Sequence, residues 1–114
     1  MRKRRWLQFV AHEVVFRPQA ERDLDSLYAY ICDQRGESMV ALGYIRRIRV
    51  FCMGLGDIPE RGTRRDDIRK GLRIAGFEKR VAIAFTFDGR IVRIGRIFYG
   101  GRDYAALMGT LDGQ

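Results

Sequence analysis

The amino-acid sequence predicts an α+β fold: an N-terminal strand, then an antiparallel helical hairpin packed on one face of a mainly antiparallel sheet. Two patterns lead to this expectation. Apolar residues in the first half recur every three or four positions, as on one face of a helix, whereas residues 81–87 alternate apolar with small side chains, as in a strand. We expect one domain at residues 13–108, a basic extension at 1–12 and a tail at 109–114, because no repeat or change of composition divides the chain.

A proline separates the first strand from the first helix. Residues 14–16 form a short β-branched and aromatic run, and Pro18 suits the first turn of a helix. Gly36 is expected to end this helix. The apolar face of the helix consists of Ala20, Leu24, Leu27, Tyr28 and Ile31.

The second helix is predicted to start at Ser38, a residue type that often caps helix N-termini, and to end at Gly54 and Gly56. The loop of residues 34–37 is short, so the two helices should lie side by side and antiparallel. The apolar positions of the second helix are Ala41, Ile45, Ile48, Cys52 and Leu55.

The second half of the chain supplies the sheet. Residues 72–75 and 81–87 are expected to be strands, and Asp88-Gly89 a two-residue turn into a further strand. This turn would pair Phe87 with Arg90, Phe85 with Val92, Ile83 with Ile94 and Val81 with Arg96. Ile83, Phe85, Val92 and Ile94 would then face the helices. The opposite face would carry Ala82, Ala84, Thr86, Ile91 and Gly95, with Arg93 as its one cation. A short helix is expected at residues 104–108.

The charge of the chain points to an anionic partner. Twenty-two Lys and Arg residues oppose fourteen Asp and Glu, a net charge of +8 that attracts nucleic acid, anionic membrane or an acidic protein. Residues 43–80 hold eleven bases and five acids, whereas residues 18–37 hold five acids and two bases. Like charges at this density repel, which favours a binding surface over a merely solvated face. The candidate partner-binding residues are Arg61, Arg64, Arg65, Arg69, Arg73, Arg80, Arg93 and Arg102.

Several kinds of site are excluded by composition. With one histidine, two cysteines and no CxxC motif, the chain has no ligand set for zinc, and we expect no metal and no cofactor. Cys32 and Cys52 should lie at distant ends of the hairpin as small core residues rather than form a disulfide. No stretch approaches the length of a membrane span, and no cleavage site follows the basic N-terminus. The sequence therefore predicts a cytoplasmic protein that does not bind membrane.

Four short segments carry a resemblance to a known family. They are residues 16–24, 59–62, 69–73 and 97–104. In their order and spacing, over residues 14–104, they resemble the RelE/ParE superfamily of type II toxin-antitoxin toxins, also called plasmid-stabilisation proteins. The strand-helix-helix-sheet order inferred from periodicity agrees with this resemblance.

The resemblance implies a small basic toxin that a cognate antitoxin neutralises. The antitoxin's flexible, acidic and amphipathic segment would wrap the hairpin and sheet. Its own DNA-binding domain would contact operator DNA, which the toxin reaches only through the antitoxin. RelE-like members cut mRNA in the ribosomal A site, whereas ParE-like members act on DNA gyrase. We expect the antitoxin to cover residues 61–80.

The residues favour the ParE-like branch. Cleavage of RNA needs a base, a cation at the phosphate and an acid for the leaving oxygen. RelE-like members place an arginine inside a tyrosine-containing strand; Ala82 stands at that position here, and Val81 and Phe85 replace the tyrosines. The expected function is therefore gyrase inhibition without a catalytic site.

Two alternatives stay open at this point. The first is a ribosome-dependent mRNA endoribonuclease, whose candidate catalytic residues are Tyr99, Arg102 and Tyr104. The second is a non-toxic member of the family that only binds its antitoxin and takes part in autoregulation of the operon.

Overall fold

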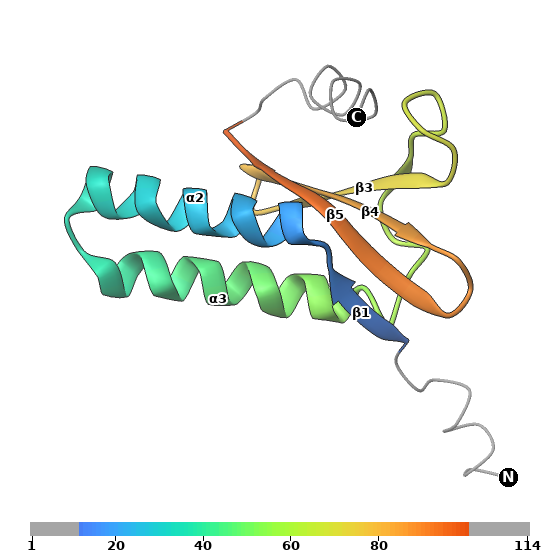
Figure 1. The fold of residues 1–114 in the computed structure, drawn as a ribbon, viewed down its shortest axis with the longest axis horizontal. Helices are drawn as coiled ribbons and strands as arrows, with labels where there is room; N and C mark the ends of the chain where they lie inside the picture. The colour runs from blue at the N-terminus through green and yellow to red at the C-terminus, as the bar shows by residue number, and fades with distance from the viewer. Residues whose placement is uncertain (1–11, 101–114) are drawn as a thin grey trace, which may run out of the picture.

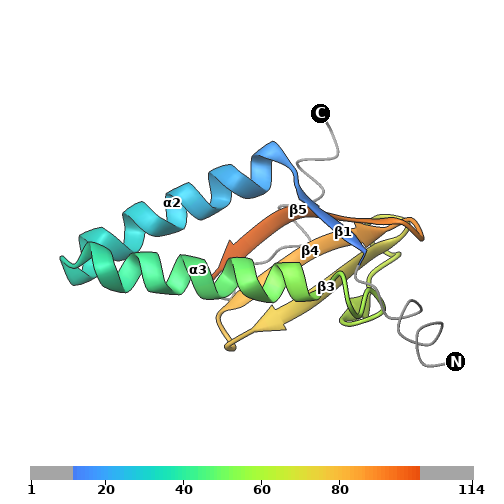
Figure 2. The same cartoon turned by 90° about the horizontal axis from the view of Figure 1, so that it is seen from below.

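Two antiparallel helices pack against a five-stranded sheet in the computed structural model, which describes residues 12–100 (Figures 1 and 2). The predicted α+β class and the order of its elements are confirmed. The elements are β1 (Glu13–Phe16), α2 (Pro18–Arg35), α3 (Ser38–Gly54), β2 (Thr63–Arg64), β3 (Leu72–Phe77), β4 (Val81–Phe87) and β5 (Ile91–Tyr99). The helix expected at residues 104–108, Arg102 and Tyr104 lie outside the described residues, as do residues 1–11 of the basic extension.

The sheet is mixed, with strand order β1-β5-β4-β3-β2. β1 runs parallel to β5, and the other three pairings are antiparallel. The parallel pairing needs a long connection between β1 and β5, because the chain must return to the same end of the sheet. The helical hairpin and the meander of β2 to β4 make this connection, so the first strand of the fold lies beside the last (Figure 1).

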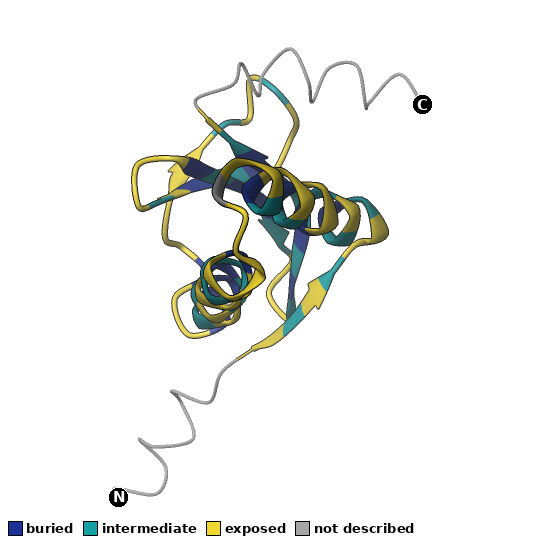
Figure 3. Cartoon of the chain, turned by 90° about the vertical axis from the view of Figure 1, so that its left-hand side faces the viewer, coloured by how far each residue is buried: buried dark blue, intermediate teal, exposed yellow. Residues whose placement is uncertain are grey.

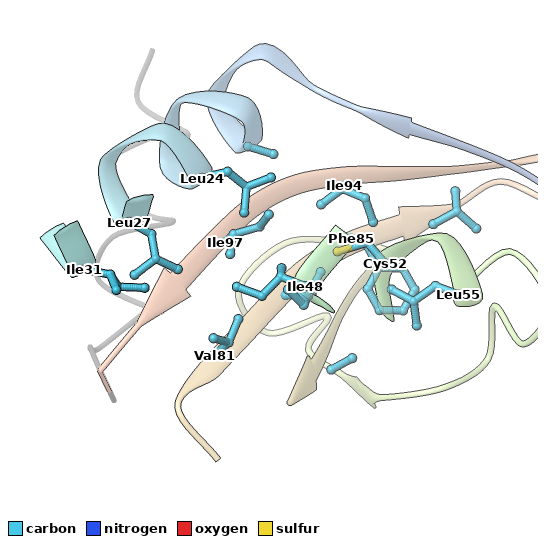
Figure 4. Packing of buried hydrophobic residues seen from close by; sticks show 14 of the residues in the cluster. Leu24, Leu27, Ile31, Ile48, Cys52, Leu55, Val81, Phe85, Ile94 and Ile97 are labelled. Carbon is cyan, nitrogen blue, oxygen red and sulfur yellow. The ribbon is translucent and has the colours of Figure 1, made fainter. Parts of the chain in front are cut away.

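The helices begin and end close to the predicted positions. Pro18 opens α2, and Gly36 ends it with a φ of 68°, a backbone conformation that glycine adopts readily. The N-cap of α3 lies one residue earlier than predicted: Glu37, not Ser38, occupies this position, without a side-chain hydrogen bond, and Ser38 is the first helical residue. The predicted apolar faces are otherwise confirmed, since Leu24, Ile48 and their neighbours are buried against the sheet (Figure 4).

The predicted register of the turn between β4 and β5 is wrong. Phe87 pairs with Val92 and Phe85 with Ile94, and the Asp88 N–H donates to the Ile91 carbonyl at 3.4 Å, so the turn lies at Gly89-Arg90 rather than at Asp88-Gly89. The Asp88 carboxylate accepts hydrogen bonds from the backbone N–H groups of Arg90 and Ile91, each at 2.9 Å, which stabilises the turn. The pairing moves by two residues, and a shift of two keeps each side chain on its face. Ile83, Phe85, Val92 and Ile94 therefore face the helices as predicted.

A β-bulge changes the second half of β5. Ala84 pairs with Arg96 although its neighbour Phe85 pairs with Ile94, so Gly95 is an extra residue in β5. One extra residue reverses the alternation of side chains beyond it. Ile83 and Val81 consequently pair with Ile97 and Tyr99, rather than with Ile94 and Arg96 as predicted.

The sheet face opposite the helices is less plain than predicted. It carries a second cation, Arg96, besides Arg93. It also has a small core of its own, whose buried members are Leu72, Ile74, Ala84 and Phe98. Phe98 reaches this face only because of the bulge, which a uniform alternation along β5 does not foresee.

Both cysteines are free thiols, and burial raises the pKa of the Cys52 thiol to about 12.

Of the helices that the structure describes, neither has the length and apolar character needed to cross a membrane.

Candidate functional site

A groove of about 620 Å³ lies on the sheet face that the helical hairpin leaves uncovered. Its floor includes Ala84 and Thr86 of β4 and Gly95 of β5, which are small residues. The first turns of α2 border it through Pro18 and Gln19. The bulge at Gly95 shapes this floor, because it places Arg96 beside Ala84 on the groove side.

The walls of the groove are cationic. Six cations come from three separate segments, and no acidic residue lines the groove within residues 12–100. The start of α2 gives two, the loop before β3 gives two and β5 gives two. These residues are Arg17, Arg22, Arg69, Lys70, Arg93 and Arg96.

Two of the cations are held by carboxylates that stand outside the groove. Arg93 forms an ion pair of 2.7 Å with Asp88 at the β4–β5 turn. That guanidinium, with the N–H groups of Ile91 and Arg90, holds the pKa of Asp88 well below its usual range. Arg17 and Lys70 form no ion pair with any residue that the structure describes. The groove thus combines fixed cations with cations that are open to a ligand.

Asp23 of α2 fixes the other β5 cation. Its carboxylate accepts hydrogen bonds from Arg96 Nε at 2.8 Å and Nη2 at 3.2 Å, and from the backbone N–H of Ile97 at 2.8 Å. The two side chains are only 11% and 14% exposed. The pair ties the early part of α2 to β5 just after the bulge, so it sets the position of the groove's α2 wall.

A second cavity, of about 310 Å³, lies between the far end of the hairpin and the end of the sheet. Tyr99 lines it, with its ring centroid 6.0 Å from that of Tyr30 and 6.2 Å from that of Tyr44. Burial, and then the nearby Tyr99 and Glu78, raise the pKa of Tyr44. Arg80 also lines this cavity.

The bulge therefore separates the sequence-predicted site residues. Tyr99 lies on the helix side of the sheet, whereas Arg93 lies in the groove on the other side. A single cleavage site that used both would need groups from opposite faces of the sheet.

The predicted arginine surface is divided as well. Of the candidates that the structure describes, only Arg69 and Arg93 line the groove. Three others are engaged locally: Arg64 pairs with Asp66 at 3.1 Å, Arg65 with Asp67 at 2.9 Å, and Arg73 donates to the Glu60 carbonyl at 3.0 Å. Arg61 stacks over the ring of Phe51, with its Cζ 5.1 Å from the centroid.

Four groove cations were not among the sequence candidates. Lys70 belongs to the basic stretch at residues 43–80 but is not one of the predicted binding residues, and Arg96 was predicted only to pair with Val81 in the sheet. Arg17 and Arg22 belong to the stretch around the first helix whose acids outnumber its bases. Arg17 is the N-cap of α2 and Arg22 lies in its second turn, and only the folded chain brings them to β5.

The outer side of the hairpin exposes several large apolar side chains. Most of the large exposed hydrophobic side chains among the described residues belong to α2 and α3, whose outward faces appear yellow in Figure 3. They are Tyr30, Met39, Val40, Leu42, Val50 and Met53. Met39 and Val50, at 75% and 66%, are the most exposed of these.

Comparison with known proteins settles the family. Residues 14–104 match the family model described as the ParE toxin of type II toxin-antitoxin systems, parDE. The chain belongs to this family. The RelE/ParE resemblance inferred from the four sequence segments is thereby confirmed, and the protein is a toxin of the type II toxin-antitoxin class.

Solved structures agree with the fold of this ParE-family toxin. It is similar to a chain of the chromosomal ParDE toxin-antitoxin system from P. aeruginosa, with 22% identity and a TM-score of 0.68, covering 79% of this chain and 97% of that one. It is also similar to a chain of the RelBE2 toxin-antitoxin complex from Mycobacterium tuberculosis, with 23% identity and a TM-score of 0.57, covering 79% and 99%. No curated protein matches the sequence.

No group of three or more His, Cys, Asp or Glu side chains within residues 12–100 is arranged to hold a metal ion.

Proposed function

We propose that this ParE-family toxin inhibits DNA gyrase by binding rather than by catalysis, and that a cognate antitoxin neutralises it. The composition of the groove supports the absence of catalysis. Its ionisable side chains, within the described residues, are five arginines and one lysine. General acid–base catalysis relies most often on His, Asp or Glu, and none of these lines the groove within residues 12–100.

A supercoiling assay tests this proposal. The purified toxin is expected to inhibit gyrase on relaxed plasmid or to trap cleaved plasmid, and to leave mRNA on translating ribosomes intact. Cleaved mRNA without any effect on gyrase would contradict the proposal and favour the ribonuclease alternative. In that case, replacement of Tyr99, Arg102 or Tyr104 should abolish cleavage. Normal growth of cells that express the soluble toxin alone would instead favour the non-toxic alternative.

The outer face of the hairpin is the surface we propose for the antitoxin. Both structural neighbours come from toxin-antitoxin systems, and exposed apolar side chains of this extent are typical of protein interfaces. Met39, Arg46 and Val50 share one face of α3, because they are spaced by seven and four residues. Arg46 forms no ion pair with a described residue. An amphipathic antitoxin segment with an acidic residue opposite Arg46 fits this face.

We expected the antitoxin to cover residues 61–80. Among the arginines of this stretch, Arg80 lines the second cavity, which lies on the hairpin side of the sheet. We therefore keep Arg80 in the proposed antitoxin surface, with Tyr99 and Tyr44 beside it.

The double variant Met39→Glu/Val50→Glu is expected to weaken antitoxin binding by about 100-fold, because it introduces two charges into an apolar contact. Isothermal titration calorimetry with the purified antitoxin measures the change. The control Arg90→Glu makes the same change in net charge at an exposed position of the β4–β5 turn, outside the hairpin, and should change affinity by less than about fivefold. Equal losses in the two variants would show that charge alone, and not the apolar face, controls binding.

A further inference from the structure

We infer that the cationic groove binds the phosphodiester backbone of a nucleic acid strand. This goes beyond the proposed function, since a gyrase inhibitor needs contact only with the enzyme. The inference rests on three properties of the groove: the origin of its cations in three separate segments, the absence of carboxylates from its described lining, and the lack of an apolar anchor.

The cations stand on different sides of the groove. Arg17 and Arg22 approach from α2, Arg69 and Lys70 from the loop before β3, and the β5 pair from the sheet. A backbone with phosphates at regular intervals can contact several of these cations, and each contact releases a condensed counterion.

The carboxylates that pair with the two β5 arginines do not line the groove. They are Asp88 and Asp23, each bonded to one of the two arginines. These bonds hold the two guanidinium groups at fixed positions. Small residues on the floor, Ala84 and Gly95, leave room for a strand to approach the sheet closely.

The groove is unsuited to a peptide partner. Interfaces between proteins depend on large apolar or aromatic anchors, whereas nucleic-acid interfaces are polar and positively charged. The large hydrophobic residues that line the groove, Leu72 and Phe85, are only 2% and 1% exposed. The exposed apolar side chains of the described residues lie elsewhere, mostly on the hairpin. Nucleic acid is therefore favoured over an acidic peptide.

The test removes two groove cations that have no ion pair, in the full-length variant Arg17→Gln/Lys70→Gln. The matched control, Lys79→Gln/Arg90→Gln, removes the same charge from exposed positions outside the groove. Fluorescence anisotropy with labelled single-stranded DNA, single-stranded RNA and duplex DNA gives Kd over a series of salt concentrations. Thermal unfolding confirms that both variants are folded.

The groove variant is expected to bind each probe about 10- to 30-fold more weakly than the control at 0.15 M salt, because it loses two phosphate contacts. Each lost contact also reduces the magnitude of the slope of log K against log salt concentration by about 0.7 to 0.9. A loss with DNA identifies DNA as the ligand, and a loss with RNA alone identifies RNA; both support the inference. Equal affinity of the two variants for all three probes would overturn it, as would displacement of every probe by an acidic peptide at equal charge concentration. Gyrase is absent from this assay, so its outcome is independent of the supercoiling result.

Discussion

Replacing Asp23 with alanine is expected to lower the free energy of unfolding by about 3 kcal/mol. The substitution removes the partner of Arg96 and the acceptor of the Ile97 N–H at once. Both side chains are nearly buried, so the arginine that remains keeps a charge with little water around it. Urea denaturation followed by circular dichroism measures the loss.

Glu21 provides the matched control, because it is on the same helix and also binds an arginine. Its pair with Arg49 is about 40% exposed at both side chains, and Glu21→Ala should cost less than about 1 kcal/mol. The double variant Asp23→Ala/Arg96→Met should recover part of the stability lost in Asp23→Ala, since no unpaired charge remains. Equal losses for Asp23→Ala and Glu21→Ala would contradict the anchoring role of Asp23.

The sequence predicts the elements well because their signals are local. Pro18 and Gly36 define α2, and the apolar period of each helix places its buried face to within a residue. The alternation in residues 81–87 likewise identifies β4 and its buried side. Each of these features depends on residues only a few positions apart, so periodicity and turn chemistry are sufficient to infer it.

The register between β4 and β5 and the make-up of the groove depend on contacts between residues far apart in the chain. Local sequence patterns do not reveal such contacts. Asp23 looks like any acid near the start of a helix, yet its partner Arg96 is 73 positions away. The cations of the groove likewise come from three segments of the chain. One of these segments lies in or beside a stretch with a net negative charge, and another lies in a stretch with a net positive charge. A charge count along the chain finds the basic stretch at 43–80, but most of its candidate arginines turn out to bond locally or to face the other side of the sheet.

Gly95 illustrates the same limit, and its deletion should have the largest effect of any single change proposed for this protein. Without the extra residue, Ile97 and Tyr99 would turn to the groove face, and Phe98 would turn toward the helices. Core contacts of Ile97 would be lost, and Asp23 would no longer meet Arg96 and the Ile97 N–H together. We expect a loss of more than about 4 kcal/mol, seen as a missing cooperative transition in thermal unfolding.

The variant Gly95→Ala separates the bulge from the glycine itself. A Cβ at this position would lie 3.5 Å from the Ala84 carbonyl oxygen, an ordinary contact distance, so the cost should stay below about 1 kcal/mol. The number of residues in β5, rather than the identity of residue 95, then determines which side chains face the helices and which face the groove. A deletion variant that unfolds as cooperatively as Gly95→Ala would mean that β5 can absorb the missing residue, and that neither the core nor the groove depends on the bulge.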